Sequence, residues 1–242
     1  MVSWHIGCSG FHYKDWRGPF YPPDMPQRKW FEYYSACFKT LELNVTFYRF
    51  PRLPFLQAWY DSCPHDFRFS VKAPRAITHY KKFKDAGRFI TSFYNTINGG
   101  LKEKLGPVLF QLPPMMKYNP EKLDAIINSV SQSFNNVIEF RHESWWRKDV
   151  YAKLGEHNIT FCGMSHPELP NEAVVNCPVV YYRFHGVPDL YRSPYTTEHL
   201  KQAVNDIAQN QRAAEAWCFF NNDYNAVAAF NAKEMKALVE TL

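Results

Sequence analysis

The feature that most constrains the fold of this chain is a regular alternation of short β-prone runs with helix-prone stretches. Such alternation is typical of βα units that build a parallel sheet. Eight β-prone runs can be counted, at residues 4–9, 40–46, 67–72, 108–112, 137–141, 159–164, 179–185 and 216–221. Eight units close a (β/α)8 barrel, and 242 residues suit that fold, which typically has about 250. We therefore predict one α/β domain, residues 1–242, folded as a single TIM-type barrel.

Helix-prone stretches occupy most of the gaps between these runs. They lie at residues 28–38, 54–62, 86–97, 120–131, 145–155, 197–209 and 225–242. Asn119 before Pro120, and Thr196 or Thr197 before Glu198, are typical helix starts. The gap between the sixth and seventh runs is too short for a full helix and reads as loop around residues 165–171. The sixth βα unit is therefore predicted to be irregular.

The charge balance limits the partners of the protein. There are 28 Lys and Arg against 23 Asp and Glu, a net charge of +5. This mild positive field favours a small anionic ligand and does not demand nucleic acid, which stays a less favoured partner. No run of about 18 uncharged apolar residues occurs, so no membrane partner is expected.

The cysteines bear on the compartment in which the protein works. The six cysteines are scattered and form no C-x-x-C pair, as expected of buried thiols in a reducing compartment: Cys8, Cys37, Cys63, Cys162, Cys177 and Cys218. The first residues show neither a basic segment nor a long apolar segment of a secretory signal. These observations predict a cytoplasmic location.

Several of the predicted strands carry one polar face, which is unusual for parallel strands covered by helices. Alternation sets Leu41, Leu43 and Val45 apart from the polar residues between them. The polar faces of four strands comprise Glu42, Asn44, Thr46; Arg68, Ser70, Lys72; Glu139, Arg141; and Arg183, His185. Because unpaired buried charge is unfavourable, these side chains should compensate one another or a ligand inside the barrel or at its mouth. A buried ion-pair network that only fixes the strand register is the alternative.

Other polar residues follow the predicted strands at their carboxyl ends, where barrel enzymes carry their active sites. They are Gln111, Arg141, His185 and the run Asn221, Asn222 and Asp223. Ser9 lies in a glycine-containing turn after the first strand, and Tyr48 lies just past the second. The sequence therefore predicts a single polar site at the C-terminal mouth.

Several segments, taken together and in order, resemble the YecE-like family, a domain of unknown function. They are residues 6–10, 13–18, 20–22, 41–49, 69–72, 110–114, 139–142 with Trp145, and 220–223. The resemblance runs from the first predicted strand to the last helix. It implies a TIM-type barrel and implies no particular reaction, because fold alone does not determine function.

Residue chemistry suggests roles within this site. Glu42, Glu139 and His185 are the candidate catalytic residues, since carboxylates and imidazole transfer protons. Lys72, Arg141 and Arg183 are candidates for holding an anion. The remaining candidates for substrate contact are Ser9, Asn44, Tyr48, Gln111, Asn221, Asn222 and Asp223. Each glutamate has a structural alternative, namely pairing with a neighbouring cation.

Three functions are compatible with these residues. The leading hypothesis is an enzyme, of hydrolase or isomerase type, acting on a small phosphorylated or sugar-like ligand by acid/base chemistry. The alternatives are a metal-dependent phosphodiesterase or nuclease-like barrel, and a non-catalytic ligand-binding protein. No cofactor and no metal ligand are predicted, since neither H-E-x-x-H nor a cysteine pair occurs, although carboxylates brought together by the fold leave a divalent metal open.

Overall fold

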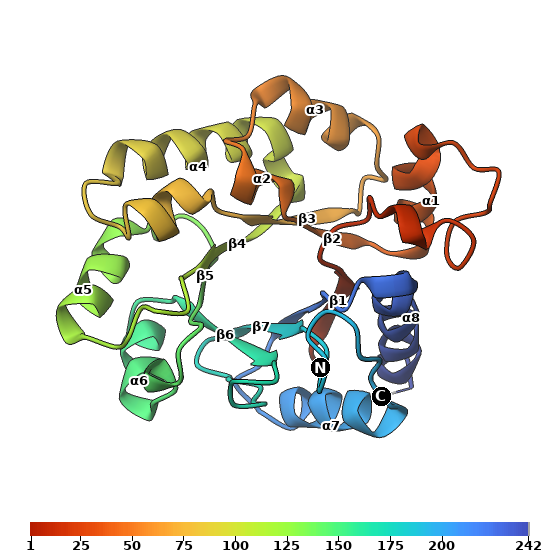
Figure 1. The fold of residues 1–242 in the computed structure, drawn as a ribbon. Coiled ribbons are helices and arrows are strands. Elements are labelled where there is room, and N and C mark those ends of the chain that lie inside the picture. Colours follow the sequence, from red (N-terminus) through yellow and green to blue (C-terminus); the bar gives the residue numbers. More distant parts are fainter. Residues whose placement is uncertain (242) are drawn as a thin grey trace.

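The eight predicted strands form a closed parallel barrel in chain order (Figure 1). The structure is a computed structural model that describes residues 1–241. The strands are β1 (Ser3–Cys8), β2 (Thr40–Leu43), β3 (Arg68–Lys72), β4 (Leu105–Gln111), β5 (Asn136–Glu139), β6 (Thr160–Ser165), β7 (Val179–Phe184) and β8 (Glu215–Phe220). Closure is made by six paired positions between β1 and β8, from Ser3 with Glu215 to Cys8 with Phe220. The predicted fold class is confirmed.

Helices surround the barrel (Figure 1). They are α1 (Trp30–Cys37), α2 (Val45–Tyr48), α3 (Leu53–Asp61), α4 (Gly87–Leu101), α5 (Pro120–Ser129), α6 (Lys148–Glu156), α7 (Thr197–Ala208) and α8 (Val227–Val239). Asn119 caps α5 by accepting a hydrogen bond from the backbone N–H of Lys122 at 3.0 Å. Within the described chain β6 passes to β7 without a helix, as predicted for the sixth unit.

Several element boundaries differ from prediction, and three of them have a local explanation. The second strand ends at Leu43, because the Thr46 hydroxyl donates to the carbonyl of Lys72 at 2.6 Å and the chain turns into α2. The helix α6 begins at Lys148, because the backbone of Trp146 (φ −80°, ψ 76°) and Arg147 (φ −140°, ψ 142°) is not helical. The last helix begins at Val227, after two residues with positive φ, and the predicted terminal residue 242 lies outside the described residues.

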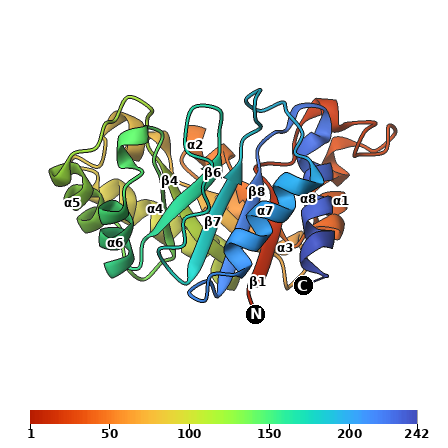
Figure 2. The same cartoon turned by 90° about the horizontal axis from the view of Figure 1, so that it is seen from below.

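The barrel interior has two unlike halves. One part is a separate, mainly apolar cluster of Leu109, Val137, Cys162, Tyr181, Trp217 and Phe219. The C-terminal half carries the inward polar residues that strand alternation predicted, including Glu42 on β2, Ser70 on β3 and Arg183 on β7. Figure 2 shows both chain termini at the end where β1 begins, so the polar half lies toward the opposite end.

Two further predictions concern the cysteines and membranes. All six cysteines lie in the described residues and are free thiols, but Cys37 and Cys63 are only partly buried, contrary to the expectation that all are buried. Both lie near the ends of outer helices rather than in strands. None of the described helices has the length and apolar character needed to cross a membrane.

Candidate active site

Arg183 is the centre of the polar half of the barrel. Its Nη2 donates to Glu42 Oε1 at 2.6 Å, and its Nη1 donates to Glu139 Oε2 at 2.7 Å. The arginine is 1% exposed and both glutamates are 0% exposed. Burial disfavours the charged guanidinium, but the two carboxylates outweigh burial and raise the pKa of Arg183 well above its ordinary value. Three strands thus contribute one fully desolvated ion cluster.

Glu42 is fixed by a second set of hydrogen bonds. The Tyr181 hydroxyl donates to Glu42 Oε2 at 2.6 Å. Ser70 Oγ lies 2.7 Å from the Tyr181 hydroxyl oxygen and donates to the carbonyl of Pro107 at 3.0 Å. Burial raises the pKa of Tyr181 well above its ordinary value, so the phenol remains a donor. Both carboxylate oxygens of Glu42 are therefore occupied.

Glu139 is also held at both oxygens. Its Oε1 accepts a hydrogen bond from Arg141 Nε, and its Oε2 is bound by Arg183. Burial opposes ionisation of this carboxyl, but Arg141 and Arg183 outweigh burial and hold the pKa of Glu139 well below its ordinary value. A permanently ionised carboxylate is a weak base. Glu139 is thus suited to holding the two guanidinium groups in place.

His185 lies beside this cluster, just after β7. Its Nε2 is 3.3 Å from Arg141 Nη2, and its Nδ1 is 3.1 Å from Asn221 Nδ2. Burial and the nearby Arg141 and Arg183 hold the pKa of His185 well below its ordinary value. Because a neutral imidazole accepts at one nitrogen only, the other ring nitrogen carries the proton. His185 is therefore a neutral imidazole at pH 7, and its lowered pKa makes it a weaker base than an ordinary histidine.

Lys72 ends β3 at the same mouth and is 8% exposed. Among residues 1–241, no carboxylate oxygen lies within 4 Å of its Nζ, and no hydrogen bond is made by that atom. Its Nζ instead lies 4.5 Å from the centre of the Phe47 ring. Burial, with the charge of Arg183, lowers the pKa of Lys72 to about 7, although Glu139 partly opposes the shift. Lys72 therefore titrates near neutral pH.

Two smaller predicted residues border the cluster. Ser9 accepts a hydrogen bond at Oγ from Arg183 Nη2, at 3.3 Å. It lies in a turn that Gly10 permits, because the φ of Gly10 is +101°. The side-chain Oδ1 of Asn44 is buried and has no hydrogen-bond partner within the described part of the chain. Such an oxygen is free to accept a hydrogen bond from a water or a ligand.

The four remaining predicted contact residues differ in burial and in contacts. Gln111 is half-buried at the end of β4, and Tyr48 is exposed at the end of α2. Asp223 is half-buried, and burial raises the pKa of its carboxyl. Asn222 is not brought to the cluster, because its amide donates to the carbonyl of Ser193 and to Asn231 Oδ1. Asn222 instead ties the loop after β7 to α8.

Two residues of the site were missed at the sequence level. Tyr181 shares the strand parity of Arg183, so the alternation rule was sufficient to place it inside the barrel. His166 follows β6 in the irregular sixth unit, and its ring centre lies 5.6 Å from that of His185. No local pattern marks His166, because its position depends on two loops that meet only in the fold.

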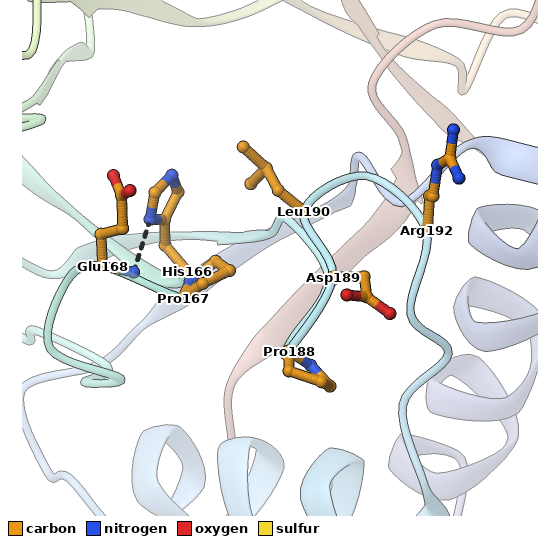
Figure 3. Close-up of a pocket in the computed structure, with 7 residues that line it drawn as sticks. All are labelled: His166, Pro167, Glu168, Pro188, Asp189, Leu190 and Arg192. Atoms are coloured by element: carbon orange, nitrogen blue, oxygen red, sulfur yellow. Dashed lines mark hydrogen bonds between the residues drawn. The ribbon is translucent and has the colours of Figure 1, made fainter.

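A cavity of about 490 Å³ adjoins this histidine. Figure 3 shows His166, Pro167 and Glu168 on one side of it, and Pro188, Asp189, Leu190 and Arg192 on the other. The dashed line marks His166 Nδ1 accepting from the backbone N–H of Glu168 at 3.1 Å. The volume is in the range of small-molecule sites. The loops after β6 and β7 thus form a compartment next to the buried cluster.

The described residues contain no group of three or more His, Cys, Asp and Glu side chains arranged to hold a metal ion. The carboxylates of the mouth, Glu42 and Glu139, are bound by arginines.

Comparisons with known proteins point to one family. A family model described as "Protein of unknown function DUF72" matches residues 5–242. The UPF0759 protein YunF of Bacillus subtilis is 26% identical over 276 aligned positions, covering 98% of this chain and 94% of that protein. The UPF0759 protein YecE of Escherichia coli K12 is 27% identical, covering 77% of this chain and 71% of that protein.

Solved structures show the same relationship. A crystal structure of a DUF72 family protein from Thermotoga maritima superposes with a TM-score of 0.89 at 30% identity, covering 98% of this chain and 99% of that one. A DUF72 family protein from Enterococcus faecalis gives a TM-score of 0.82 at 20% identity, covering 98% and 95%, and supports the fold alone. The resemblance to YecE-like proteins is confirmed, and the chain belongs to the DUF72 family of TIM-barrel proteins of unknown function.

Proposed function

We propose that the protein is an enzyme that binds a small anionic substrate, phosphorylated or sugar-like, at the C-terminal mouth of the barrel and transfers protons there. The observation that carries this proposal is the ammonium group of Lys72, which is buried without a carboxylate partner. The nearby Arg141 and Arg183 are already matched by two glutamates. Protonated Lys72 is thus the excess positive charge of the mouth, and an anion would supply its counter-charge.

The proton chemistry is assigned from protonation states. Glu42 and Glu139 were predicted as acid or base, but all four of their oxygens are engaged, so we assign them to orienting the cations. His185 keeps its predicted catalytic role, because it is neutral. Lys72 joins it, because a group that titrates near pH 7 exchanges protons efficiently at that pH. The adjoining cavity beside His166 has room for the rest of a small substrate.

Anion binding is tested with inorganic phosphate. We expect millimolar phosphate to raise the Tm of the wild-type protein, and Lys72→Met to weaken this binding at least about tenfold, the loss of one charge-assisted contact. Lys102→Met, which removes an exposed lysine at the other end of the barrel, is the matched control. Equal phosphate binding by the wild type and Lys72→Met would contradict the proposal.

Catalysis is tested separately from binding. Wild-type protein is screened for turnover of phosphorylated sugars and simple phosphate esters. With a substrate in hand, His185→Asn should lower kcat about 100-fold, as expected for the loss of a proton-transfer group, with phosphate binding retained. Tight binding of these compounds without turnover would overturn the enzyme proposal in favour of a ligand-binding protein.

A further inference from the structure

Lys72 stands apart from the other charged groups of the mouth because it lacks an opposite charge. Glu42 gives one oxygen to Arg183 and the other to Tyr181. Glu139 gives one oxygen to Arg183 and the other to Arg141. All four carboxylate oxygens of Glu42 and Glu139 are therefore bound by other groups, and none is left for the Lys72 ammonium.

The surroundings of Lys72 favour its neutral form. Its side chain is almost fully buried, and its Nζ faces the ring of Phe47 at 4.5 Å. The nearby charges come from two guanidinium groups and two carboxylates that cancel each other. Burial and Arg183 lower its pKa to about 7, so about half of the lysine is an unprotonated amine at pH 7. An exposed lysine, with an ordinary pKa of about 10.4, has almost none of this form.

An unprotonated amine at the ligand site of a barrel is a nucleophile. Buried lysines near other cations are the type that form imines with carbonyl compounds. From the unpartnered, desolvated position of Lys72 we propose that its Nζ forms an imine with a small carbonyl substrate that also bears an anionic group. This inference rests on the proposed function, because it requires the mouth to be the ligand site.

The reaction balances without a further reactant. The Nζ lone pair attacks the carbonyl carbon, and one amine hydrogen moves to the carbonyl oxygen to give a carbinolamine. The carbinolamine loses that oxygen with both amine hydrogens as one water molecule, leaving a C=N bond to Lys72. Water reverses the step. Protonation of the imine nitrogen places a cation against the Phe47 ring, which a ring face stabilises.

The neighbouring groups match an anionic carbonyl compound. Arg141 is about 9% exposed in its side chain, and its Nη2 lies 3.3 Å from His185 Nε2. Guanidinium groups bind carboxylates and phosphates in a bidentate manner. Such a contact would hold the anionic group beside Lys72, so that the unprotonated fraction of the amine can react with the carbonyl carbon. The substrate class is therefore a keto acid or a phosphorylated ketone or aldehyde.

The test traps the imine by reduction. Full-length protein at pH 7 is mixed with pyruvate or dihydroxyacetone phosphate and sodium cyanoborohydride, and the product is analysed by intact and peptide mass spectrometry. We expect one adduct per chain, with the mass of the probe less one oxygen atom, on Lys72 and at least about tenfold above any other lysine, as the unprotonated fractions predict. Lys72→Met should lose the adduct.

The experiment has an internal control and distinct failures. Lys104 is as buried as Lys72, but its Nζ donates to the carbonyls of Tyr60 and Cys63, so it should stay unlabelled. Labelling spread over the lysines according to exposure, or no labelling of Lys72, would overturn the imine proposal. If phosphate still raises Tm in that case, the proposed function stands and only the imine fails. Because the wild type carries the readout, misfolding of a variant does not affect the result.

Discussion

The two ends of the barrel each bury a lysine, and they treat it differently. At the N-terminal end Lys104 is 4% exposed, and its Nζ donates to the carbonyls of Tyr60 at 2.7 Å and Cys63 at 2.9 Å. At the C-terminal end Lys72 is 8% exposed, and among residues 1–241 its Nζ makes no hydrogen bond or ion pair and lies 4.5 Å from the centre of the Phe47 ring. Burial alone thus does not distinguish the two lysines. The two lysines differ instead in the hydrogen-bond partners of their ammonium groups.

A pair of asparagines repeats the contrast. Asn136 begins β5 at the N-terminal end, accepts a hydrogen bond from the Tyr94 hydroxyl and donates to the carbonyls of Ser131 and Phe134. Asn44 follows β2 at the C-terminal end, and within residues 1–241 its buried Oδ1 accepts no hydrogen bond. Asn136 thus has all its amide groups satisfied within the protein. The C-terminal end leaves some polar groups unsatisfied, as expected of a face that binds ligands.

The largest expected effect comes from breaking the ion cluster of the C-terminal half. Arg183→Met leaves Glu42 and Glu139 buried without their shared cation. Loss of one partner of a buried ion pair costs about 3–5 kcal/mol, so urea unfolding should show a drop of that size. Arg147→Met is the control, because it breaks an exposed pair with Asp149 and should change stability much less. Equal losses would show that the cluster is hydrated in solution.

The second largest expected effect is a difference in stability between variants of the two buried lysines, Lys104 and Lys72. Lys104→Met leaves two buried carbonyls without their donor and should lower the free energy of unfolding by about 2–3 kcal/mol. Lys72→Met removes a desolvated charge that has no partner, so it should leave stability unchanged or raise it at pH 7. Urea midpoints of both variants, measured together, decide the comparison. A larger loss for Lys72→Met would mean that its ammonium is satisfied in a way the structure does not show.

The pH dependence of stability isolates Lys72 further. Its pKa is about 7 when folded and about 10.4 when unfolded, so between these values the unfolded chain binds more protons and stability rises with pH. From pH 7 to pH 9 this contributes about 2 kcal/mol to the free energy of unfolding. The charged or titratable groups that influence the Lys72 ammonium or lie near it are Arg183, Arg141, Glu139, Glu42 and His79.

The measurement is the difference between wild type and Lys72→Met across that range. Because the other titrating groups are common to both proteins, the difference should carry the Lys72 contribution. Wild type should gain on the variant as pH rises. A flat difference from pH 7 to pH 9 would mean that Lys72 stays protonated, and would also remove the basis for a nucleophilic amine.

The sequence predicted the direction of the inward charged residues but not how they pair. The period of two along each strand placed Glu42, Glu139 and Arg183 on inward faces, and the structure joins them there. Their pairing was not predictable, because Arg183 and Glu42 are 141 positions apart and only the closed barrel sets their separation. Alternation says which way a side chain points and nothing about which partner faces it.

Prediction was weakest where strands give way to loops. The expected strand at residues 40–46 ends early, because Thr46 bonds to the backbone of the neighbouring strand. Asn222 was predicted to contact substrate from its place after β8, but α8 and the loop after β7 take its amide. These are long-range contacts between loops, and no local pattern encodes them. The rim of the site therefore required the structure.

The smallest expected effect is the one that separates the two asparagines. Asn44→Ala removes an amide oxygen that has no partner, so the free energy of unfolding should change by no more than about 0.5 kcal/mol. Asn136→Ala removes the acceptor of Tyr94 and the donor to two carbonyls, and should be more costly by about 2 kcal/mol. If Asn44 is kept free for a ligand, Asn44→Ala should weaken phosphate-ester binding while stability is unchanged. A loss of stability equal to that of Asn136→Ala would mean that bound water already satisfies Asn44, and the two ends of the barrel would then differ only at their lysines.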